Sequence, residues 1–580
     1  MTHFLISIDK TDKNFKIIEH SDDIQIIDNH NILMLFDGNN SSNILEAYTL
    51  EGINFIKKIQ GSFSLFLYDK IKNQFFIAKD KVGIKPLYYA DTHETIIVGT
   101  HLKRFSKNTK FSPEINPSTL GEYLQFGFIL QPNTIFKNAY KVCAGEYLTF
   151  NLKDYTYTKH KYWELESCYQ EEKCLHNETE VLQQTDELLN SIIEKETKNA
   201  HYGLSLSGGY DSSTLTAIAQ KQSATKVDTF TIGFFDENIN EAHDAKEIAT
   251  SLGTNHHEHY FTEDDAMKVI SKMHEIFDEP FADYAAAPTI ITSELLKQQG
   301  IQQLIVGDGG DEVFATAENV HGFERLQNTP KILKVIMAKT LNSIKLQHVP
   351  YLKNYKNLPI KQNKLYHLLM AQNIPQMIYG RNTLFLESEL NLHVRGYKPL
   401  IVNSFDNINF NNPAETVDEV IGAYFKTTMV DGELVKSYST MNHANIKLST
   451  PFLDESLLNH MAKIPSSLKI KNGIKKYLLK EIAHQYIPKK LLDRPKSGFA
   501  IPFASWMQNN LKEILYLQIN KKRLDKDNIF YTTSILNIRD QFYAGNEAYK
   551  YKLWRIFIFQ LWYENFTNTQ ITKDKPSKSV

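Results

Sequence analysis

Cysteine is scarce in this sequence. Only Cys143, Cys168 and Cys174 occur among 580 residues, too few for a disulfide framework and without the CxxC spacing of zinc ligands. No apolar run approaches the roughly 20 residues that a transmembrane helix needs. The start, MTHFLISIDKTDK, lacks the basic segment of a signal peptide. These absences predict a cytoplasmic globular protein without a membrane anchor.

An excess of charge of either sign is also missing. Lys and Arg total 65 and Asp and Glu 67, which gives a net charge of −2. No global field therefore points toward nucleic acid or an anionic membrane as a partner. Locally, residues 331–364 are rich in lysine and could bind an acidic or peptide partner, but we interpret them as a solvated helix face.

Internal repeats and low-complexity linkers are absent, and the length predicts two to four domains. Strand-like alternation marks the first 160 residues, as in 63–69, 74–80 and 146–152. Strands at 203–206, 227–234 and 303–306 then alternate with helices at 212–221, 241–252 and 289–299, which predicts a parallel sheet covered by helices. Beyond about residue 320 the strand signal nearly disappears, and segments such as 331–345 and 454–463 favour helix.

One short stretch combines a strand end, a glycine turn and a helix start: 207-SGGYDSS-213. Gly208 and Gly209 permit a tight turn, and backbone N–H groups at the start of the next helix would attract an anion. The Walker A pattern does not match. Asp211 would repel a bare phosphate, but a magnesium ion between the carboxylate and a pyrophosphate removes that conflict.

A second acidic turn follows a later strand in 304-LIVGDGGDEVF-314. Because the carboxyl ends of parallel strands gather at one edge of a sheet, Asp311 can face the Asp211 turn. Two carboxylates beside a glycine turn predict a magnesium-pyrophosphate site. A structural glycine turn is the alternative for either turn taken alone.

Together these stretches resemble the asparagine synthetase family. The resemblance extends to 229-TFTIGF-234, 278-DEPFADYAAAPT-289, 451-PFLD-454, 475-KKYLLK-480 and 493-DRPKSGFAIPF-503, and 61–89 resembles part of the family's glutaminase domain. It implies a glutaminase-like, layered β-sheet domain of the Ntn-hydrolase type at 1–165. It also implies an α/β ATP pyrophosphatase domain at 177–565 with a largely helical C-terminal half, and we expect a disordered tail at 566–580.

The resemblance implies roles for individual residues. A carboxylate is activated by ATP as an acyl-adenylate, pyrophosphate leaves, and an amine attacks. The residues that would hold pyrophosphate are Ser207, Gly208, Gly209, Asp211, Ser212 and Ser213, with magnesium on Asp211 and Asp311. Leu206, Ile232 and Gly307 would contact adenosine, Lys476 the α-phosphate, and Asp308 would be the general base near the amine. A homodimer is compatible with the resemblance.

The sequence departs from the family at both active sites. Glutamine-dependent members begin Met-Cys-Gly, whereas this chain begins Met1, Thr2, His3 and has no cysteine before Cys143. In the synthetase half, four charged positions that we place beside the acyl site differ: Tyr438, Ser439, Lys447 and Ser449. We therefore read the glutaminase domain as degenerate, and Tyr438 as part of an altered acyl site.

These departures favour an ATP-dependent amide ligase that uses an amine or ammonia directly, with a small-molecule or peptide carboxylate. β-Lactam synthetases and lasso-peptide cyclases in the family also lack the cysteine and close an amide within one substrate. Two alternatives remain open: an asparagine synthetase that uses free ammonia or a partner glutaminase, and a nucleotide-binding interaction protein. The histidines of 256-HHEH-259 lack the spacing of a metal site.

Overall fold

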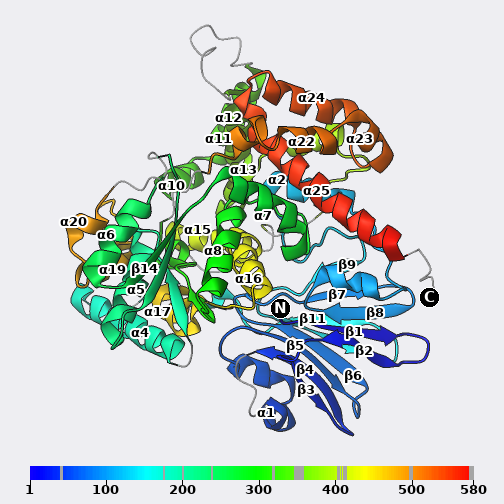
Figure 1. Ribbon diagram of the computed structural model, residues 1–580, viewed down its shortest axis with the longest axis horizontal. Coiled ribbons are helices and arrows are strands. Elements are labelled where there is room, and N and C mark those ends of the chain that lie inside the picture. The colour runs from blue at the N-terminus through cyan, green and yellow to red at the C-terminus, as the bar shows by residue number, and fades with distance from the viewer. Residues whose placement is uncertain are drawn as a thin grey trace.

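The computed structural model describes residues 1–38, 44–173, 177–198, 201–236, 240–316, 320–344, 358–401, 405, 408, 410, 415–494 and 501–573. The N-terminal domain and the parallel-sheet domain lie side by side, and the C-terminal helices pack against both (Figure 1).

The N-terminal domain consists of two antiparallel sheets. One has the order β2-β1-β8-β7-β9 and the other β11-β10-β6-β5-β4-β3. The strands are β1 (Phe4–Asp9), β2 (Phe15–His20), β3 (Gln25–Asp28), β4 (Ile32–Gly38), β5 (Phe63–Asp69), β6 (Gln74–Lys79), β7 (Tyr88–Asp91), β8 (Thr95–Gly99), β9 (Ala139–Lys141), β10 (Glu146–Asn151) and β11 (Tyr157–Lys161). Between them lie α1 (Ile44–Glu51), η1 (Gly52–Lys58), η2 (Leu102–Lys107) and α2 (Pro117–Phe126).

Alternation along the strands explains the layers of this domain. Phe4 and Ile6 of one sheet and Phe66 and Ile77 of the other belong to one buried cluster between the sheets. Leu5 alternates with them and packs in the cluster that contains the C-terminal helices. The domain is thus fixed to the rest of the chain by the outer face of its first sheet.

The second domain contains a parallel five-stranded sheet of order β14-β13-β12-β15-β16. Its strands are β12 (Tyr202–Ser205), β13 (Asp228–Gly233), β14 (Asn255–Tyr260), β15 (Gln303–Ile305) and β16 (Lys447–Ser449). The helices before and between them are α3 (Leu165–Cys168), α4 (Glu178–Thr197), α5 (Tyr210–Gln222), α6 (Ala242–Leu252), α7 (Glu263–Ile276) and α8 (Ala286–Gln298).

The remaining regular elements, in the part of the chain that the structure describes, are helices. They are α9 (Gly310–Val313), α10 (Val320–Asn328), α11 (Lys331–Ser343), α12 (Leu358–Met370), α13 (Ile374–Asn382), α14 (Glu387–His393), α15 (Thr416–Tyr424), the π-helix η5 (Phe425–Glu433), α16 (Leu434–His443), η6 (Pro451–Leu453), α17 (Glu455–Ala462), α18 (Ser466–Lys469), α19 (Tyr477–His484), α20 (Lys489–Leu492), α21 (Phe503–Gln508), α22 (Lys512–Gln518), α23 (Lys521–Asp527), α24 (Thr532–Tyr543), η7 (Glu547–Tyr549) and α25 (Lys550–Lys573).

The predicted fold class is confirmed: two antiparallel sheets, then a parallel sheet, then a helical C-terminal half. Three details differ from expectation. The edge strand β16 is too short, at three residues, for a periodic signal. Helix α25 continues to Lys573, inside the segment for which we expected disorder, and residues 574–580 lie outside the described residues.

The third difference concerns the lysine-rich region. Helix α11 exposes Ile332, Leu333, Ile336 and Met337 and buries Lys334, so its outer face is apolar as well as basic. Lys331 and Lys339 are exposed, as a solvated lysine face requires, but exposed apolar side chains accompany them on this helix. Residues 345–357 of the region lie outside the described residues.

Candidate active site

The candidate active site lies where the chain reverses its direction of travel across the parallel sheet. From β12 the chain moves outward through β13 to β14, and it then returns to add β15 and β16 on the other side of β12. The turns that follow β12 and β15 are therefore neighbours at the carboxyl edge of the sheet, where open α/β sheets bind their ligands.

The glycine turn after β12 has the backbone geometry that the sequence predicts. Gly208 has a φ of 81°, in the left-handed region, and a Cβ there would lie 3.2 Å from the backbone nitrogen of Ala245. Gly209 is the N-cap residue of α5. The Ser212 hydroxyl accepts from the backbone N–H of Ser207 at 3.1 Å, and the two serine hydroxyls are 3.1 Å apart. The turn is therefore closed by its own serines.

The acidic turn after β15 packs directly on the first turn. A Cβ at Gly307 would lie 3.0 Å from Cβ of Asp211, and a Cβ at Gly310 would lie 2.7 Å from the Asp211 carboxyl carbon. Only glycine leaves this space, which explains the GDGG pattern. Asp211 and Asp311 are thereby brought to one point, as the sequence predicts.

Lys476 joins these two aspartates. Its Nζ lies 2.6 and 2.5 Å from the two carboxylate oxygens of Asp211 and 2.5 Å from Oδ1 of Asp311. Burial alone would lower the pKa of Lys476, but the Asp211 and Asp311 carboxylates raise it above its usual value. The lysine therefore stays a cation and holds the two acidic turns together.

The backbone of Lys476 is unusual. Its φ is 54°, in the left-handed region that non-glycine residues seldom adopt, and it is the N-cap residue of α19. Such a conformation costs of order 1 kcal/mol and is concentrated at functional sites. Because this conformation places Nζ between the two carboxylates, it supports a functional role for the lysine.

A polar cavity of about 560 Å³ opens in front of these turns. All three residues expected near adenosine, Leu206, Ile232 and Gly307, line it. So do Ser207, Asp211, Ser212, Asp308 and Asp311. Lys476 does not line this cavity, so it contacts the two aspartates on the side away from the cavity.

Ser213 differs from the prediction. It is fully buried within α5, does not line the cavity, and its Oγ has no hydrogen-bond partner among the described residues. It faces the helix packing because it follows Ser212 by one residue, which is about 100° around a helix. Like Gly208 and Gly209 it is absent from the cavity lining, and its hydroxyl is buried in the helix packing.

Asp308 forms part of a charged wall on the other side of the cavity. Its Oδ2 accepts a hydrogen bond from the Ser437 hydroxyl at 2.6 Å. Burial raises the pKa of Asp308, against the opposing effects of Ser437 and Lys436. Lys436 itself lies 3.1 Å from Asp283 and 2.5 Å from Glu433, so three acidic side chains surround one cation.

Several residues of this wall were missed by sequence reasoning, namely Asp283, Glu312, Glu433, Lys436 and Ser437. Glu312 lines the cavity, and its Oε2 has no hydrogen-bond partner among the described residues. Burial, reinforced by Asp311, raises the pKa of Glu312 to about 8. The GDGGDE turn could have pointed to Glu312, but nothing local marks the other four as neighbours of ATP.

The carboxylates at this edge offer the hard oxygen ligands that Mg²⁺ prefers. Among the described residues, no three His, Cys, Asp or Glu side chains gather so as to hold a metal by themselves. A magnesium ion at Asp211 and Asp311 would therefore need phosphate oxygens as further ligands. The buried, unpartnered oxygen of Glu312 fits such a cation nearby.

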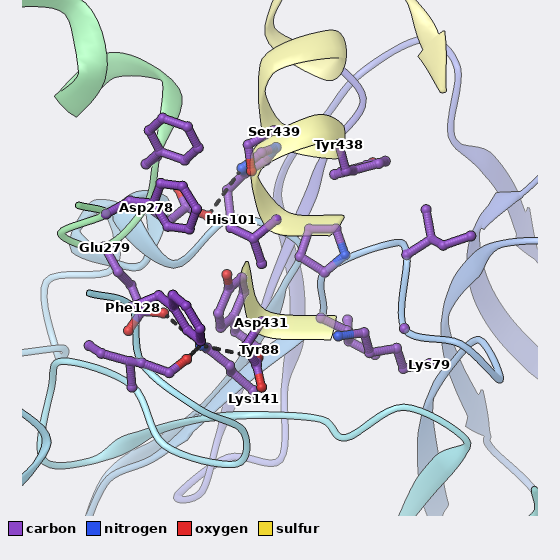
Figure 2. Close-up of a pocket in the computed structure, with 18 of the residues that line it drawn as sticks. Lys79, Tyr88, His101, Phe128, Lys141, Asp278, Glu279, Asp431, Tyr438 and Ser439 are labelled. Atoms are coloured by element: carbon purple, nitrogen blue, oxygen red, sulfur yellow. Dashed lines mark hydrogen bonds and ion pairs between the residues drawn. The ribbon is translucent and has the colours of Figure 1, made fainter. Parts of the chain in front are cut away.

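None of the four substituted positions lines the cavity in front of the two glycine turns. Tyr438 and Ser439 line a small cavity between the two domains (Figure 2). Lys447 and Ser449 lie on β16, where Ser449 Oγ donates to Glu196 at 2.9 Å and Lys447 Nζ lies 3.6 Å from the same carboxylate. Ser437, the residue before Tyr438 in α16, lines the cavity at the glycine turns instead, because neighbouring residues are about 100° apart around a helix. Tyr438 is thus absent from the lining of the cavity in front of the glycine turns, which we call the ATP cavity.

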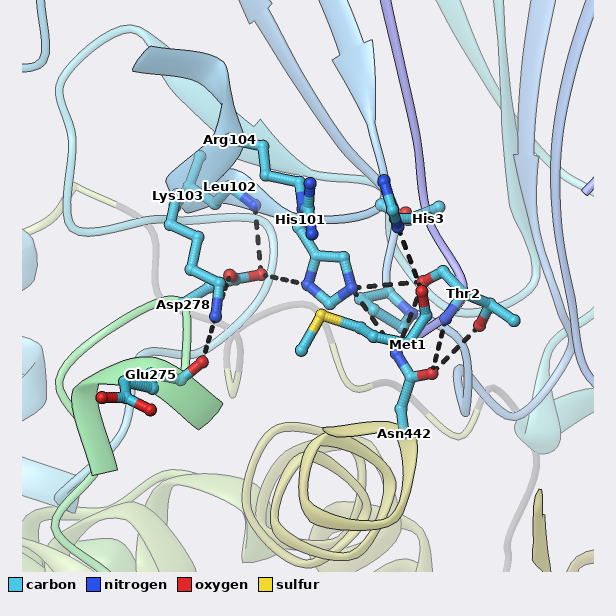
Figure 3. A network of polar contacts seen from close by, with 12 residues as sticks. Met1, Thr2, His3, His101, Leu102, Lys103, Arg104, Glu275, Asp278 and Asn442 are labelled. Carbon is cyan, nitrogen blue, oxygen red and sulfur yellow. Dashed lines mark hydrogen bonds and ion pairs between the residues drawn. The ribbon is translucent and has the colours of Figure 1, made fainter. Parts of the chain in front are cut away.

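Thr2 is engaged with the other domain (Figure 3). Its backbone N–H and its hydroxyl donate to Oδ1 of Asn442 at 2.9 and 3.1 Å. His101 lies 3.3 Å from the Thr2 carbonyl oxygen through Nε2 and 3.2 Å from Asp278 through Nδ1. Burial, and then Asp37, raise the pKa of Tyr438 far above its usual value, against a hydrogen bond with Thr2.

The histidines of β14 bond to separate partners. His256 lies 2.9 Å from the Thr229 hydroxyl, and His257 lies 2.9 Å from Asp228. His259 lies 3.0 Å from Asp265. These contacts account for the three rings as parts of the sheet and its helix caps.

Comparison with known proteins agrees with this geometry. The family model for asparagine synthase matches residues 184–564, and the model for a glutamine amidotransferase domain matches 36–163. "Asparagine synthetase [glutamine-hydrolyzing] 1" of Bacillus subtilis is 26% identical over 87% of this chain and 78% of its own length. "Putative asparagine synthetase [glutamine-hydrolyzing] 2" of Methanocaldococcus jannaschii is 31% identical over 52% of this chain and 59% of its own length. The "Amidase chry2" of Gibberella zeae is 22% identical over 81% of this chain and 74% of its own length.

Among solved structures, the chain resembles NMN synthetase from Francisella tularensis at 17% identity and a TM-score of 0.19, over 25% of this chain and 60% of that one. This score is too low to add to the assignment. No helix within the described ranges is long and apolar enough to span a membrane.

The sheet order, the paired acidic turns and the domain matches define an ATP-dependent, AMP-forming carbon–nitrogen ligase with a glutaminase-like N-terminal domain. The chain belongs to the asparagine synthase family.

Proposed function

We propose that this enzyme joins a carboxylate to an amine without hydrolysing glutamine. The observation that carries the proposal is the pair of hydrogen bonds that Thr2 donates to Asn442. Where a glutaminase needs a cysteine nucleophile, the chain has Thr2, whose amide and hydroxyl both donate to Asn442. The amine therefore comes from solution or from the substrate itself.

In the proposed reaction, a carboxylate oxygen of the substrate attacks the α-phosphorus of ATP and pyrophosphate leaves. The amine nitrogen then attacks the acyl carbon, and AMP leaves as the new amide forms. Asp211 and Asp311 would hold magnesium, which when bound neutralises charge on the leaving pyrophosphate. Ser207, Gly208, Gly209 and Ser212 surround the phosphates, and Lys476 fixes the two aspartates. Asp308 accepts the proton that the amine loses.

The acid-rich wall supports a substrate that itself carries the amine. Asp283, Asp308 and Glu433 surround Lys436, so negative groups outnumber positive ones there. An ammonium or amine group is a better match for this wall than a second carboxylate is. This favours ring closure within one substrate, as in β-lactam synthetases or lasso-peptide cyclases, over ligation of aspartate with ammonia.

A substrate screen tests the proposal directly. Amino-carboxylates and peptides with an acidic side chain are incubated with ATP and Mg²⁺, and pyrophosphate and a product lighter by one water are measured. Aspartate with ammonia serves as the competing pair. Efficient asparagine formation would contradict the proposal and would make the enzyme an ammonia-dependent asparagine synthetase.

We expect the rate of amide formation to rise with pH through the pKa of Asp308. Burial raises this pKa, so the carboxylate takes up a proton at a higher pH than an ordinary aspartate does, and only the ionised form can accept a proton from the amine. In Asp308→Asn this dependence should vanish and amide formation should fall about 10²-fold or more, while pyrophosphate release continues. Hydroxylamine, which captures an acyl-adenylate without a base, should restore product. Loss of pyrophosphate release in Asp308→Asn would show a role in adenylation instead.

We expect no glutamate from glutamine, and no covalent labelling by a glutamine-mimicking electrophile. Thr2→Ala should leave amide formation unchanged, with a stability loss of about 1 kcal/mol from the hydrogen bond to Asn442. Mass spectrometry measures the covalent labelling, and a thermal unfolding series measures the loss of stability. Glutamine hydrolysis that disappears in Thr2→Ala would identify a threonine nucleophile, contrary to the proposal.

A further inference from the structure

The N-terminal domain is retained although its cysteine nucleophile is absent. A lysine that is buried where this domain meets the synthetase domain indicates a reason for its retention. Lys141, the last residue of β9, is 7% exposed and lines the cavity between the domains (Figure 2). Its Nζ lies 3.1 Å from Oε2 of Glu279 and 3.6 Å from Oδ1 of Asp431. It also donates to the carbonyl oxygen of Ile129. One cation of the N-terminal domain thus reaches two acidic residues of the synthetase domain.

Asp431 lines the interface cavity, in a helix that also contributes to the wall of the ATP cavity. It lies in η5, whose Met429 and Glu433 line that cavity, and η5 continues without a break into α16 with Lys436 and Ser437. The backbone N–H of Gln131 also donates to Asp431, at 2.9 Å. A π-helical segment is uncommon and is frequently found at functional sites.

Glu279 lines the interface cavity, in the loop 278–285 that contributes Asp283 to the same charged wall. Its Oε1 accepts from the backbone N–H of Ile135 at 2.7 Å. Four residues later in the same loop, Asp283 lines the ATP cavity and lies 3.1 Å from Nζ of Lys436. The charged wall thus has two parts, η5 with α16 and the loop 278–285, which are called the two walls below. Lys436 and Asp283 join them at the cavity, and Lys141 joins them at the domain interface.

We propose that Lys141 is a positioning residue, through which the N-terminal domain sets the distance between the two walls of the ligase site. That the two walls belong to a ligase site rests on the proposed function. The contacts of Lys141 with Glu279 and Asp431 do not depend on the substrate. Without the cation, Glu279 and Asp431 repel each other at a buried interface, so the walls separate there. The turns at Asp211 and Asp311 are held by Lys476 and are unaffected.

Hydrogen exchange of the whole chain tests the inference without any substrate. Lys141→Met is compared with Lys552→Met, because Lys552 is also 7% exposed and lies 2.5 Å from a carboxylate, Glu389, away from both cavities. We expect amides of 425–443 and 278–285 to exchange about tenfold faster or more in Lys141→Met only. Lys141→Arg should restore most of the protection because it keeps the charge. Binding of ATP with Mg²⁺, measured by calorimetry, should change less than about threefold, because its phosphate turns are elsewhere.

A second variant separates positioning from folding. If Lys141→Met does not fold, the same measurement is made on Lys141→Met combined with Glu279→Gln and Asp431→Asn, which also removes the charges of the two carboxylates that Lys141 contacts. Faster exchange in the two walls is still expected, because the tie remains absent. Exchange equal to that of Lys552→Met in these segments, in whichever variant folds, would overturn the inference. Failure of the substrate screen with faster wall exchange would reject only the proposed function.

Discussion

Lys476→Met should lower the rate of pyrophosphate release about 10²-fold or more, the loss typical of removing one preorganised charge from a catalytic site. In this structure the lysine holds Asp211 and Asp311 at 2.5 to 2.6 Å. Without it the two carboxylates lose the ammonium group that joins them, and the turns that carry them are held less firmly. The change should reduce turnover far more than it raises the apparent KM for ATP. Steady-state kinetics with the best carboxylate from the screen measure both.

Lys552→Met is the matched control for this variant as well. Both lysines are 7% exposed, and each bonds a carboxylate. We expect Lys476→Met to lose less stability than the about 3–5 kcal/mol of a fully buried pair, because the Asp311 side chain is 46% exposed. If both variants lose turnover in proportion to their unfolding, Lys476 is a stability residue only. A change confined to KM would make it a ground-state contact.

The sequence predicted most of the sheet edge, because its signals are local. Gly208, Asp211 and Asp311 lie in turns where strand, glycine and helix start follow one another within a few residues. Parallel strand order then brings the turns together without further information. The bounds of β5 agree to the residue and those of β12, β13 and β15 to within one, for the same reason.

The residues of the charged wall could not be predicted, because tertiary contacts determine which side chains come together there. Ser437 and Tyr438 are adjacent in the sequence, yet one bonds Asp308 in the ATP cavity and the other faces Thr2 across the domain interface. Lys141 is 138 residues from Glu279 and 290 from Asp431, and nothing near it in the sequence indicates a buried role. Without the fold, the direction of each α16 side chain was undetermined.

Asp211→Asn and Asp311→Asn should each abolish magnesium-dependent pyrophosphate release, with residual activity at least about 10³-fold below that of the unchanged protein. Each removes a charged oxygen that we propose as a magnesium ligand at the edge where the two glycine turns meet. The structural costs should differ. Asp211 contacts Lys476 through both oxygens and lies against Gly310, whereas Asp311 contacts it through one and is 46% exposed. Asp211→Asn should therefore lower the melting temperature more than Asp311→Asn does.

Glu389→Gln, which removes the carboxylate that pairs with Lys552, is the control for both variants. It should keep full activity. Titration with Mg²⁺ and then Mn²⁺ distinguishes a metal ligand from a partner of Lys476. A lost ligand raises the metal concentration needed for half-maximal rate, because one of the hard oxygen donors is gone. A lost lysine partner lowers the rate at every metal concentration and leaves that midpoint in place. Full activity of Asp311→Asn at low Mg²⁺ would remove this residue from the metal site, and Asp211 with Glu312 would then be the pair to test.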